Sequence, residues 1–171
     1  RSVARSDGNS LRIYAPETLA AQTWAATSGW KYSTAAFAYT PANDRLQGAT
    51  NLHAVVLLQF FDATGTNILQ TYESDYFMTN ATAGTWSNLE AVGVAPRGSV
   101  YGRTVLGVLG TNSGFAGSVY FDDVTQRIVQ TTSSVSGLIR NPGFDDCAPD
   151  NAYTLQQTNS FFNWKWNGGN N

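Results

Sequence analysis

The stretch GSVYFDDV, residues 117–124, decides the class of fold. It combines β-branched and aromatic residues with alternating character, which is typical of a β-strand. The alternation places Val119 and Phe121 on one face of that strand, and Tyr120 and Asp122 on the other. We therefore expect the first pair to pack in a core and Asp122 to leave that core.

Short runs of the same kind occur elsewhere in the chain, and Gly, Asn or Asp separates them. They read SLRIYA, WKYSTAAFAYT, HAVVLLQFF, ILQTYESDYF, NLEAVGV and RTVLGVLG. Their length and spacing predict an all-β sandwich of antiparallel sheets with little or no helix. The segment from Asp62 to Asn67, DATGTN, lies between two of the runs, and we expect it to form a hairpin turn.

One segment leaves two alternatives open. Residues 15–26, APETLAAQTWAA, offer Pro16 as a first helical residue before an Ala-rich run, which favours a helix. The rest of the chain is predicted to be strand, and tertiary context often overrides local propensity. A short helix and a strand are equally compatible with this segment.

The composition excludes several classes of protein. Of the 171 residues, 42% are hydrophobic and 13% aromatic, so the chain can build a packed core and is not disordered throughout. Ten Lys and Arg against twelve Asp and Glu give a formal net charge of −2, and no basic run is present. These charges argue against a nucleic-acid partner and against an anionic membrane surface. No apolar segment has the length of a transmembrane helix, and none resembles a signal peptide.

The polar character comes from Thr, Asn, Ser and Gly, because charged residues make up only 13% of the chain. Lysine occurs only at Lys31 and Lys165. This composition predicts an extracellular or cell-surface protein. Cys147 is the only cysteine, so no disulfide can form within the chain and the core has to hold the fold.

The chain divides into three parts. Residues 1–129 contain the predicted strands and are expected to form the body of the sandwich. Residues 130–137, QTTSSVSG, have the composition of a linker. Residues 138–171 form a second segment that is rich in aromatic residues.

An ordered series of motifs covers most of residues 8–129. It consists of GNSLRIY, GWKYSTAAFAY, LQFFDATGT, TWSNLEAVGVAP and GSVYFDDV. The series resembles the carbohydrate-binding modules of the galactose-binding-like jelly-roll superfamily. This resemblance implies a jelly-roll β-sandwich that binds a polysaccharide or another glycan and catalyses no reaction.

The motif NPGFDDCAP, residues 141–149, resembles the opening motif of that superfamily but stands near the C-terminal end of this chain. Three arrangements would accommodate it. Residues 138–171 could complete the sandwich of their own chain, begin the next module of a tandem array, or add a strand to a neighbouring subunit. The third arrangement would produce a homopolymer, and the protein would then be a structural subunit of an extracellular filament.

The resemblance also implies a structural calcium ion. Carboxylates of the opening motif and of the closing strand hold this ion in the superfamily, together with backbone carbonyls near the Gly-Asn-Ser strand. The matching groups here are Asp145 or Asp146, Asp122 or Asp123, and the backbone of residues 7–10. Calcium prefers several hard oxygen ligands, so these residue types suit it. Without the resemblance, both Asp pairs would be ordinary turn and strand residues.

Sugar sites combine flat aromatic rings, which stack on the apolar face of a sugar, with side chains that bind its hydroxyl groups. The candidates are residues that the predicted core does not need. They are Trp24, Trp30, Tyr39, Tyr72, Tyr76 and Tyr101, with Gln59, Gln70 and Arg103 as polar partners. The resemblance instead implies a packing role for Trp86, Phe61, Phe121, Phe144 and Trp164. For any single tyrosine, packing is the commoner role.

Little in the sequence predicts catalysis. His53 is the only histidine, so a zinc site cannot be read from histidine spacing. A Gly-x-Ser-x-Gly elbow and a phosphate-binding glycine loop are both absent from the sequence, and no spacing singles out two carboxylates for glycoside hydrolysis. We therefore expect a binding module rather than an enzyme.

Overall fold

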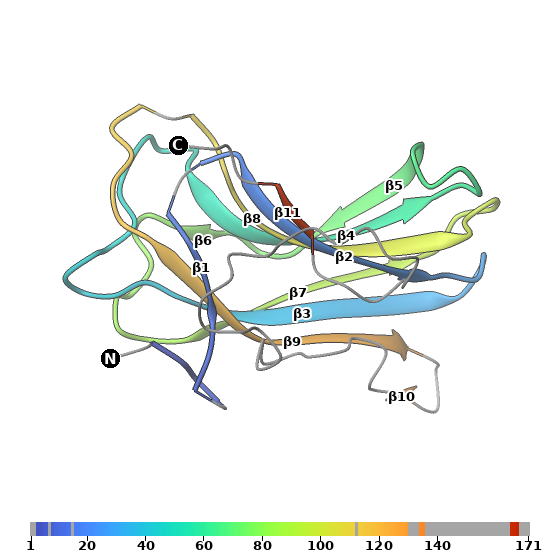
Figure 1. The fold of residues 1–171 in the computed structure, drawn as a ribbon, viewed down its shortest axis with the longest axis horizontal. Coiled ribbons are helices and arrows are strands. Elements are labelled where there is room, and N and C mark those ends of the chain that lie inside the picture. The colour runs from blue at the N-terminus through green and yellow to red at the C-terminus, as the bar shows by residue number, and fades with distance from the viewer. Residues whose placement is uncertain are drawn as a thin grey trace.

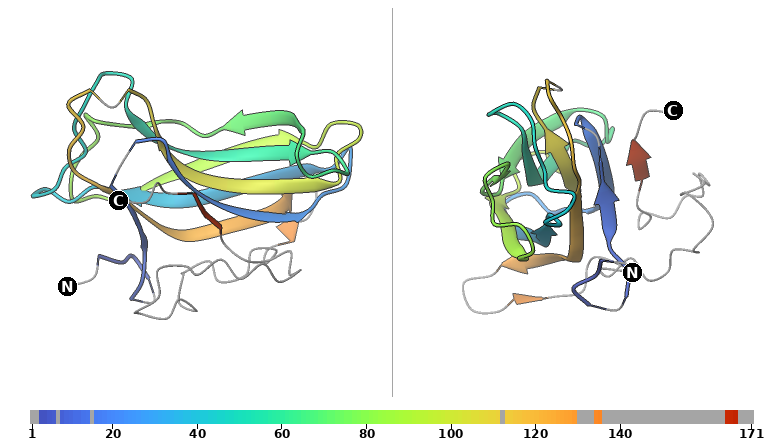
Figure 2. Two further views of the ribbon diagram at one scale, coloured as in Figure 1. Left: turned by 45° about the horizontal axis from the view of Figure 1, so that its top comes forward. Right: turned by 90° about the vertical axis from the view of Figure 1, so that its left-hand side faces the viewer.

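Two antiparallel sheets pack face to face (Figures 1 and 2). This arrangement is seen in a computed structural model that describes residues 3–6, 8–14, 16–111 and 113–129, together with strands Ser134–Val135 and Lys165–Asn167. All elements among these residues are strands. The prediction of an all-β sandwich is confirmed. No helix in the described part of the chain has the length and apolar character needed to cross a membrane.

The first sheet, called here the five-stranded sheet, has the order β1-β9-β3-β7, with β10 also paired to β9. Its strands are β1 (Leu11–Ile13), β3 (Lys31–Tyr39), β7 (Ser87–Val94), β9 (Val119–Val129) and β10 (Ser134–Val135).

The second sheet, called here the six-stranded sheet, has the order β11-β2-β8-β4-β5, with β6 also paired to β4. Its strands are β2 (Thr18–Ala25), β4 (His53–Phe61), β5 (Ile68–Glu73), β6 (Phe77–Met78), β8 (Tyr101–Leu109) and β11 (Lys165–Asn167).

The ambiguous Ala-rich segment is strand β2. It pairs with β8 along its whole length, from Thr18 opposite Val108 to Ala25 opposite Tyr101. Its residues alternate between buried and less buried positions, which is the period of a strand and not of a helix. Pairing with a central strand therefore overrides the helical propensity of the alanines.

The space between the sheets holds two apolar clusters. The larger contains Ile13, Leu106 and Phe121, all fully buried. The other is aromatic: Trp24 lies 4.7 Å from Tyr32 and 6.1 Å from Phe60 between ring centroids. Burying such large apolar side chains stabilises each by about 1.5–3 kcal/mol relative to exposure. The core thus forms without a disulfide.

A third apolar cluster lies on the opposite face of the six-stranded sheet. Val55, Leu57 and Val105 form it, and all three are buried. Their neighbours Val56 and Leu106 point into the inter-sheet core, so alternation places the cluster on the outer face. The outer face of this sheet therefore has an apolar area at its centre.

The predicted hairpin turn between β4 and β5 is confirmed. The backbone N–H of Asp62 donates to the carbonyl of Asn67 at 3.2 Å. The Asp62 carboxylate accepts the backbone N–H and the hydroxyl of Thr64, which is an Asx-type turn. These hydrogen bonds lower the pKa of Asp62, with the Thr64 hydroxyl as the largest cause.

Candidate functional site

Trp24 cannot serve a ligand at the surface, which corrects the prediction made for it. Its side chain is only 2% exposed and is packed against Tyr32 in the inter-sheet core. The indole N–H donates to the hydroxyl of Thr104 at 3.4 Å. Gly102 makes room for the ring, because a Cβ at this position would lie 2.2 Å from it. Trp24 is a core residue.

Tyr72 also has a structural role. Its ring lies directly over Gly93, where a Cβ would approach it to 2.2 Å, and its hydroxyl donates to the carbonyl of Val94 at 3.0 Å. Tyr72 belongs to the edge strand β5 of one sheet, whereas Gly93 and Val94 belong to the edge strand β7 of the other. The side chain therefore ties two edge strands together across the sandwich.

Three other predicted aromatic residues lie apart from one another. Trp30 is 43% exposed in the turn between β2 and β3. Tyr76 is 49% exposed and stacks on His53, with 4.0 Å between ring centroids. Its hydroxyl donates to Glu73, and this hydrogen bond and the negative charge of Glu73 raise the pKa of Tyr76. Tyr39 lies at the end of β3, on the other sheet.

Two predicted polar residues, Gln59 and Arg103, lie side by side on the outer face of the six-stranded sheet. They are register partners on β4 and β8. Thr71 on β5 faces Gln59, and Thr23 on β2 faces Arg103, so four polar side chains cross four strands. We call Thr71, Gln59, Arg103 and Thr23 the polar row.

Contacts within the sheet hold Arg103 in place. The guanidinium carbon lies 4.1 Å from the centroid of the Phe61 ring, which is a cation–π contact. The Nε–H of Arg103 donates to the hydroxyl of Thr23 at 3.2 Å. Partial burial lowers the pKa of Arg103, and an arginine guanidinium stays protonated in proteins at neutral pH. Thr23 takes one of the five N–H donors of the guanidinium.

Gln59 offers both a donor and an acceptor beside Arg103. Its side chain is half-buried, and it has no hydrogen-bond partner among the residues that the structure describes. Tyr101, another predicted residue, is half-buried two register positions along from Arg103, opposite Phe61. Gln59, Arg103 and Tyr101 are therefore brought together on one face.

The two threonines of this face were not predicted as site residues. The threonines of the polar row have no sequence signal of their own, because they are two of many threonines in the chain. Phe61 is buried, as the resemblance implies, and it lies beneath the Arg103 guanidinium. Gln70, in contrast, pairs with Phe60 and is exposed outside the row.

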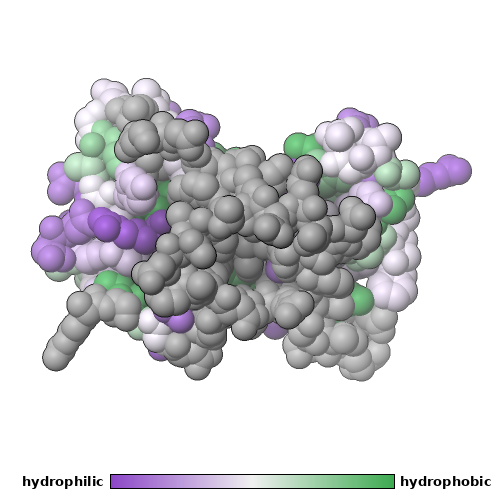
Figure 3. Space-filling view, in the orientation of Figure 1, coloured by the Kyte–Doolittle hydropathy of each residue, from purple (hydrophilic) through white to green (hydrophobic). Residues whose placement is uncertain are grey.

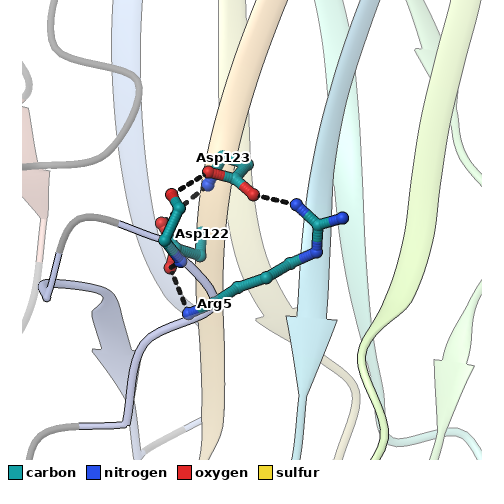
Figure 4. A network of polar contacts seen from close by, with 4 residues as sticks. Arg5, Asp122 and Asp123 are labelled. Atoms are coloured by element: carbon teal, nitrogen blue, oxygen red, sulfur yellow. Dashed lines mark hydrogen bonds and ion pairs between the residues drawn. The ribbon is translucent and has the colours of Figure 1, made fainter.

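The predicted calcium ligands Asp122 and Asp123 lie on β9 beside the N-terminal segment (Figure 4). Asp122 is fully buried, although alternation predicts that it leaves the core. The reason is that residues 5 and 6 cover it: Asp122 Oδ2 accepts the backbone N–H groups of Arg5 at 2.7 Å and of Ser6 at 3.2 Å. Burial is the largest cause of a raised pKa at Asp122, opposed by these backbone hydrogen bonds.

Asp123 is neutralised by an arginine. The Arg5 guanidinium forms an ion pair with one carboxylate oxygen, and the Ser6 hydroxyl donates to the other. Asp123 has a φ of 49°, and the register of β3 against β9 shifts nearby, between Ala35 and Phe37. A bulge of this kind re-aims side chains, and here both carboxylates meet the N-terminal segment.

Only some of the expected calcium ligands are among the described residues. Within the described part of the chain, no group of three or more His, Cys, Asp or Glu side chains is close enough to hold a metal ion. The Asp122 and Asp123 carboxylates accept hydrogen bonds from Arg5 and Ser6. Asp7, Asp145 and Asp146 lie outside the described residues. Calcium binding stays a prediction.

No family model and no curated protein match the chain. Among solved structures, it resembles the CBM22-1–GH10 modules of an endo-1,4-β-D-xylanase 10B from Clostridium thermocellum, in complex with xylohexaose. That match has 16% identity and a TM-score of 0.42, and it covers 67% of this chain and 19% of the other.

A second resembling structure is the enzymatically active domain of tailspike protein 4 of bacteriophage CBA120. It has 13% identity and a TM-score of 0.48, with 71% of this chain and 16% of the other covered. This chain thus spans less than a fifth of either protein chain. The bound xylohexaose is a ligand of the first of those proteins, and the enzymatic activity belongs to the second.

Proposed function

We propose that this protein is a non-catalytic carbohydrate-binding β-sandwich of the extracellular space or the cell surface, and that a polysaccharide chain binds at the polar row. The observation that carries the proposal is the register of β4 and β8, which places Gln59 beside Arg103 on the outer face of the six-stranded sheet. Tyr101 adds an aromatic side chain two register positions away.

The chemistry of the polar row suits sugar hydroxyl groups. A hydroxyl both donates and accepts hydrogen bonds, and it needs partners of both kinds when it leaves water. The Gln59 amide and the threonine hydroxyls can do both, whereas Arg103 only donates. A polysaccharide presents such hydroxyls at regular intervals, so a row of polar side chains across several strands can bind successive ones.

Preorganisation supports a binding role for Arg103. Immobilising a flexible side chain on ligand binding costs about 0.5–1.5 kcal/mol. Phe61 and Thr23 already hold the guanidinium before any ligand arrives. Less of the binding free energy is then lost to ordering the side chain.

A binding role also fits the residue types better than hydrolysis does. Glycoside hydrolysis requires two carboxylic groups on either side of the bond that is cleaved. The polar row consists of one amide, one guanidinium and two hydroxyls, none of which has this chemistry. We therefore propose that the protein holds a polysaccharide and leaves it uncut.

The alternative role, a filament subunit assembled by strand donation, has no structural observation in its favour. Residues 165–167 form β11, which pairs with β2 of the same chain through Trp166 opposite Ala20. The displaced motif at residues 141–149 lies outside the described residues. Membership of a tandem array likewise stays a prediction.

The experiment is a binding screen of the purified protein by affinity electrophoresis against soluble xylan, mixed-linkage glucan, galactomannan and polygalacturonate. For each polysaccharide that retards the protein, we expect Gln59→Ala and Arg103→Ala to weaken binding about tenfold, which corresponds to about 1.4 kcal/mol. Isothermal titration with matching oligosaccharides quantifies the loss.

Matched controls are available in this chain. Gln70→Ala and Arg97→Ala remove exposed residues of the same types outside the polar row, and both variants should bind like the wild type. The proposal is wrong if none of the polysaccharides retards the wild-type protein. It is equally wrong about the site if Gln59→Ala and Arg103→Ala match their controls.

A further inference from the structure

A row of aromatic side chains crosses the outer face of the five-stranded sheet, on the opposite side of the sandwich from the polar row. Tyr39 on β3 and Tyr120 on β9 are register partners, and Arg12 on β1 is the register partner of Tyr120. Trp86, next to the first residue of β7, lies 4.9 Å from Tyr39 between ring centroids. We call Trp86, Tyr39, Tyr120 and Arg12 the aromatic row.

We propose that the aromatic row is a second carbohydrate-binding surface, which takes a neutral polysaccharide chain by stacking. The inference rests on the proposed function for its class of ligand. The aromatic row and the polar row have no residue in common. With two surfaces on opposite faces, one molecule would bridge two polysaccharide chains.

The aromatic row is not needed for the core. Ala38 and Phe121, which neighbour Tyr39 and Tyr120 along their strands, are fully buried and belong to the inter-sheet core. Alternation therefore turns the tyrosines outward, where each remains half-buried, as does Trp86. Three neighbouring rings at a half-exposed surface suit a flat apolar ligand face.

The rings of the aromatic row meet at two different angles. Trp86 and Tyr39 are tilted by 33°, whereas Tyr39 and Tyr120 meet edge to face at 72° and 6.3 Å. In an edge-to-face contact, the ring that supplies its edge keeps both of its own faces clear of that partner. The rings therefore do not close into a single stack.

An exposed tyrosine extends the surface beyond the four strands. The Arg12 guanidinium carbon lies 5.7 Å from the Tyr120 centroid and 5.8 Å from the Tyr14 centroid. Tyr14 is 55% exposed, the largest exposed fraction among the large hydrophobic residues that the structure describes. Three strand spacings of about 4.8 Å give the aromatic row a length of roughly 14 Å, which is more than one sugar ring spans.

The charges favour a neutral ligand over an anionic polymer. Arg12 is the single cation of the aromatic row, and its Nη2 lies 2.8 Å from a carboxylate oxygen of Asp44. The same oxygen accepts the hydroxyl of Ser118 at 2.5 Å. Arg12 is thus already paired, and the aromatic row together with Asp44 has no net positive charge to attract uronates, phosphates or nucleic acid.

Polar groups border the aromatic row, as a sugar ligand requires. Asp44 lies in the segment between β3 and β4, which extends beyond the sheets in Figure 1. Hydrophilic residues gather at the tip of the same end in the space-filling view, with hydrophobic ones beside them (Figure 3). Asn88 adds an exposed amide beside this end of the sheet, opposite Phe37 in the register. These groups can bind the hydroxyls around a stacked sugar ring.

The test measures retention of the full chain on insoluble cellulose, chitin and xylan, using Trp86→Ala, Tyr120→Ala and the exposed Tyr14→Ala. We expect each variant to lose about fivefold in affinity for the retaining solid. Trp30→Ala and Tyr76→Ala are the matched controls, because both residues are exposed outside the aromatic row. Melting curves identify any variant that fails to fold. In that case Tyr14→Ala decides whether the aromatic row binds the solid, because the Tyr14 side chain is largely exposed.

The outcomes separate this inference from the proposed function. Loss of retention in the aromatic-row variants, with retention unchanged in Arg103→Ala, supports two independent surfaces. If the three variants are retained like Trp30→Ala, the aromatic row is not a binding surface, whatever the polar row does. If the wild type is retained by none of the solids, the inference is overturned. Binding at the polar row is then tested only by the screen with soluble polysaccharides.

Discussion

At the scale of single residues, environment decides which candidate side chains remain available. Trp24 and Tyr39 are both aromatic residues on strands, yet Trp24 is buried between the sheets and Tyr39 lies on an outer face. Residue type and alternation cannot distinguish Trp24 from Tyr39. The sandwich has two outer faces and one interior, and alternation does not show which of these a side chain meets. Residue type alone therefore selects aromatic candidates without separating buried residues from surface residues.

Asp122 illustrates the same limit. Alternation assigns its face relative to Phe121, but the burial of Asp122 depends on Arg5 and Ser6, which are more than 100 residues away in the chain. No residue within GSVYFDDV indicates that Arg5 and Ser6 will bury Asp122. Burial by a distant segment has to be seen in the structure.

Glu90 gives a pH prediction at this scale. Hydrogen bonding from Ser33, together with Arg127 at 2.8 Å, lowers the pKa of Glu90 in the folded protein below 4.5. A carboxyl with a lowered folded pKa contributes stability above its unfolded pKa, and the contribution is lost as the pH falls through the folded value. Glu90→Gln should therefore lower the free energy of unfolding at neutral pH, by less than about 1 kcal/mol because the pair is partly exposed.

Urea denaturation of wild type and Glu90→Gln at several pH values measures this contribution. The difference between the two proteins should shrink progressively below pH 4.5. A difference that stays constant into the acid range would show that Glu90 contributes through packing and not through its charge.

At the scale of elements, the strands were predictable and their partners were not. The runs HAVVLLQFF and RTVLGVLG each read as a strand, and alternation groups the residues of each face. The register between β4 and β8 joins Gln59 to Arg103, 44 residues apart, and no local pattern encodes that pairing. The polar row and the aromatic row are products of register, which explains why sequence reasoning found some members of each row and missed others.

A glycine on β8 makes room for a large ring on β2. Gly102 is the register partner of Trp24, and a Cβ at Gly102 would overlap the indole ring. Gly102→Ala should destabilise the fold by about 1–3 kcal/mol, as overpacking of a core does. The free energy of unfolding from urea titration measures the cost.

A double variant tests the cause of that cost. Trp24→Phe removes part of the indole that meets the added methyl group, so Gly102→Ala should cost less in the Trp24→Phe background than in the wild type. Strictly additive costs would mean that the two residues do not compete for the same space.

At the scale of the whole molecule, the role of residues 138–171 connects to the predicted calcium ion. The resemblance assigns Asp145 or Asp146 and Asp122 or Asp123 to one ion, which would join this segment to the body. A ligand that binds only the folded state raises its stability in proportion to the logarithm of its concentration. Millimolar calcium should therefore raise the melting temperature, and removal by a chelator should reverse the rise.

The control for calcium binding is Asp145→Asn, paired with Asp75→Asn at an exposed position. Only the first variant should lose the calcium-dependent part of the melting temperature. A wild-type melting temperature that is the same with calcium and with chelator would exclude the ion, and Arg5 would then be the cation that balances Asp123 among the described residues.

Carbohydrate binding at the polar row is the central claim, and side-chain NMR during a glycan titration tests it most directly. The protein is titrated with an oligosaccharide of the polysaccharide that retards it in the electrophoresis screen. We predict that the side-chain amide signals of Gln59 and the Nε–H signal of Arg103 shift together, with the same saturation curve, while the signals of Gln70 and Arg97 stay in place. Shifts confined to other parts of the molecule, with Gln59 and Arg103 unchanged, would contradict the claim.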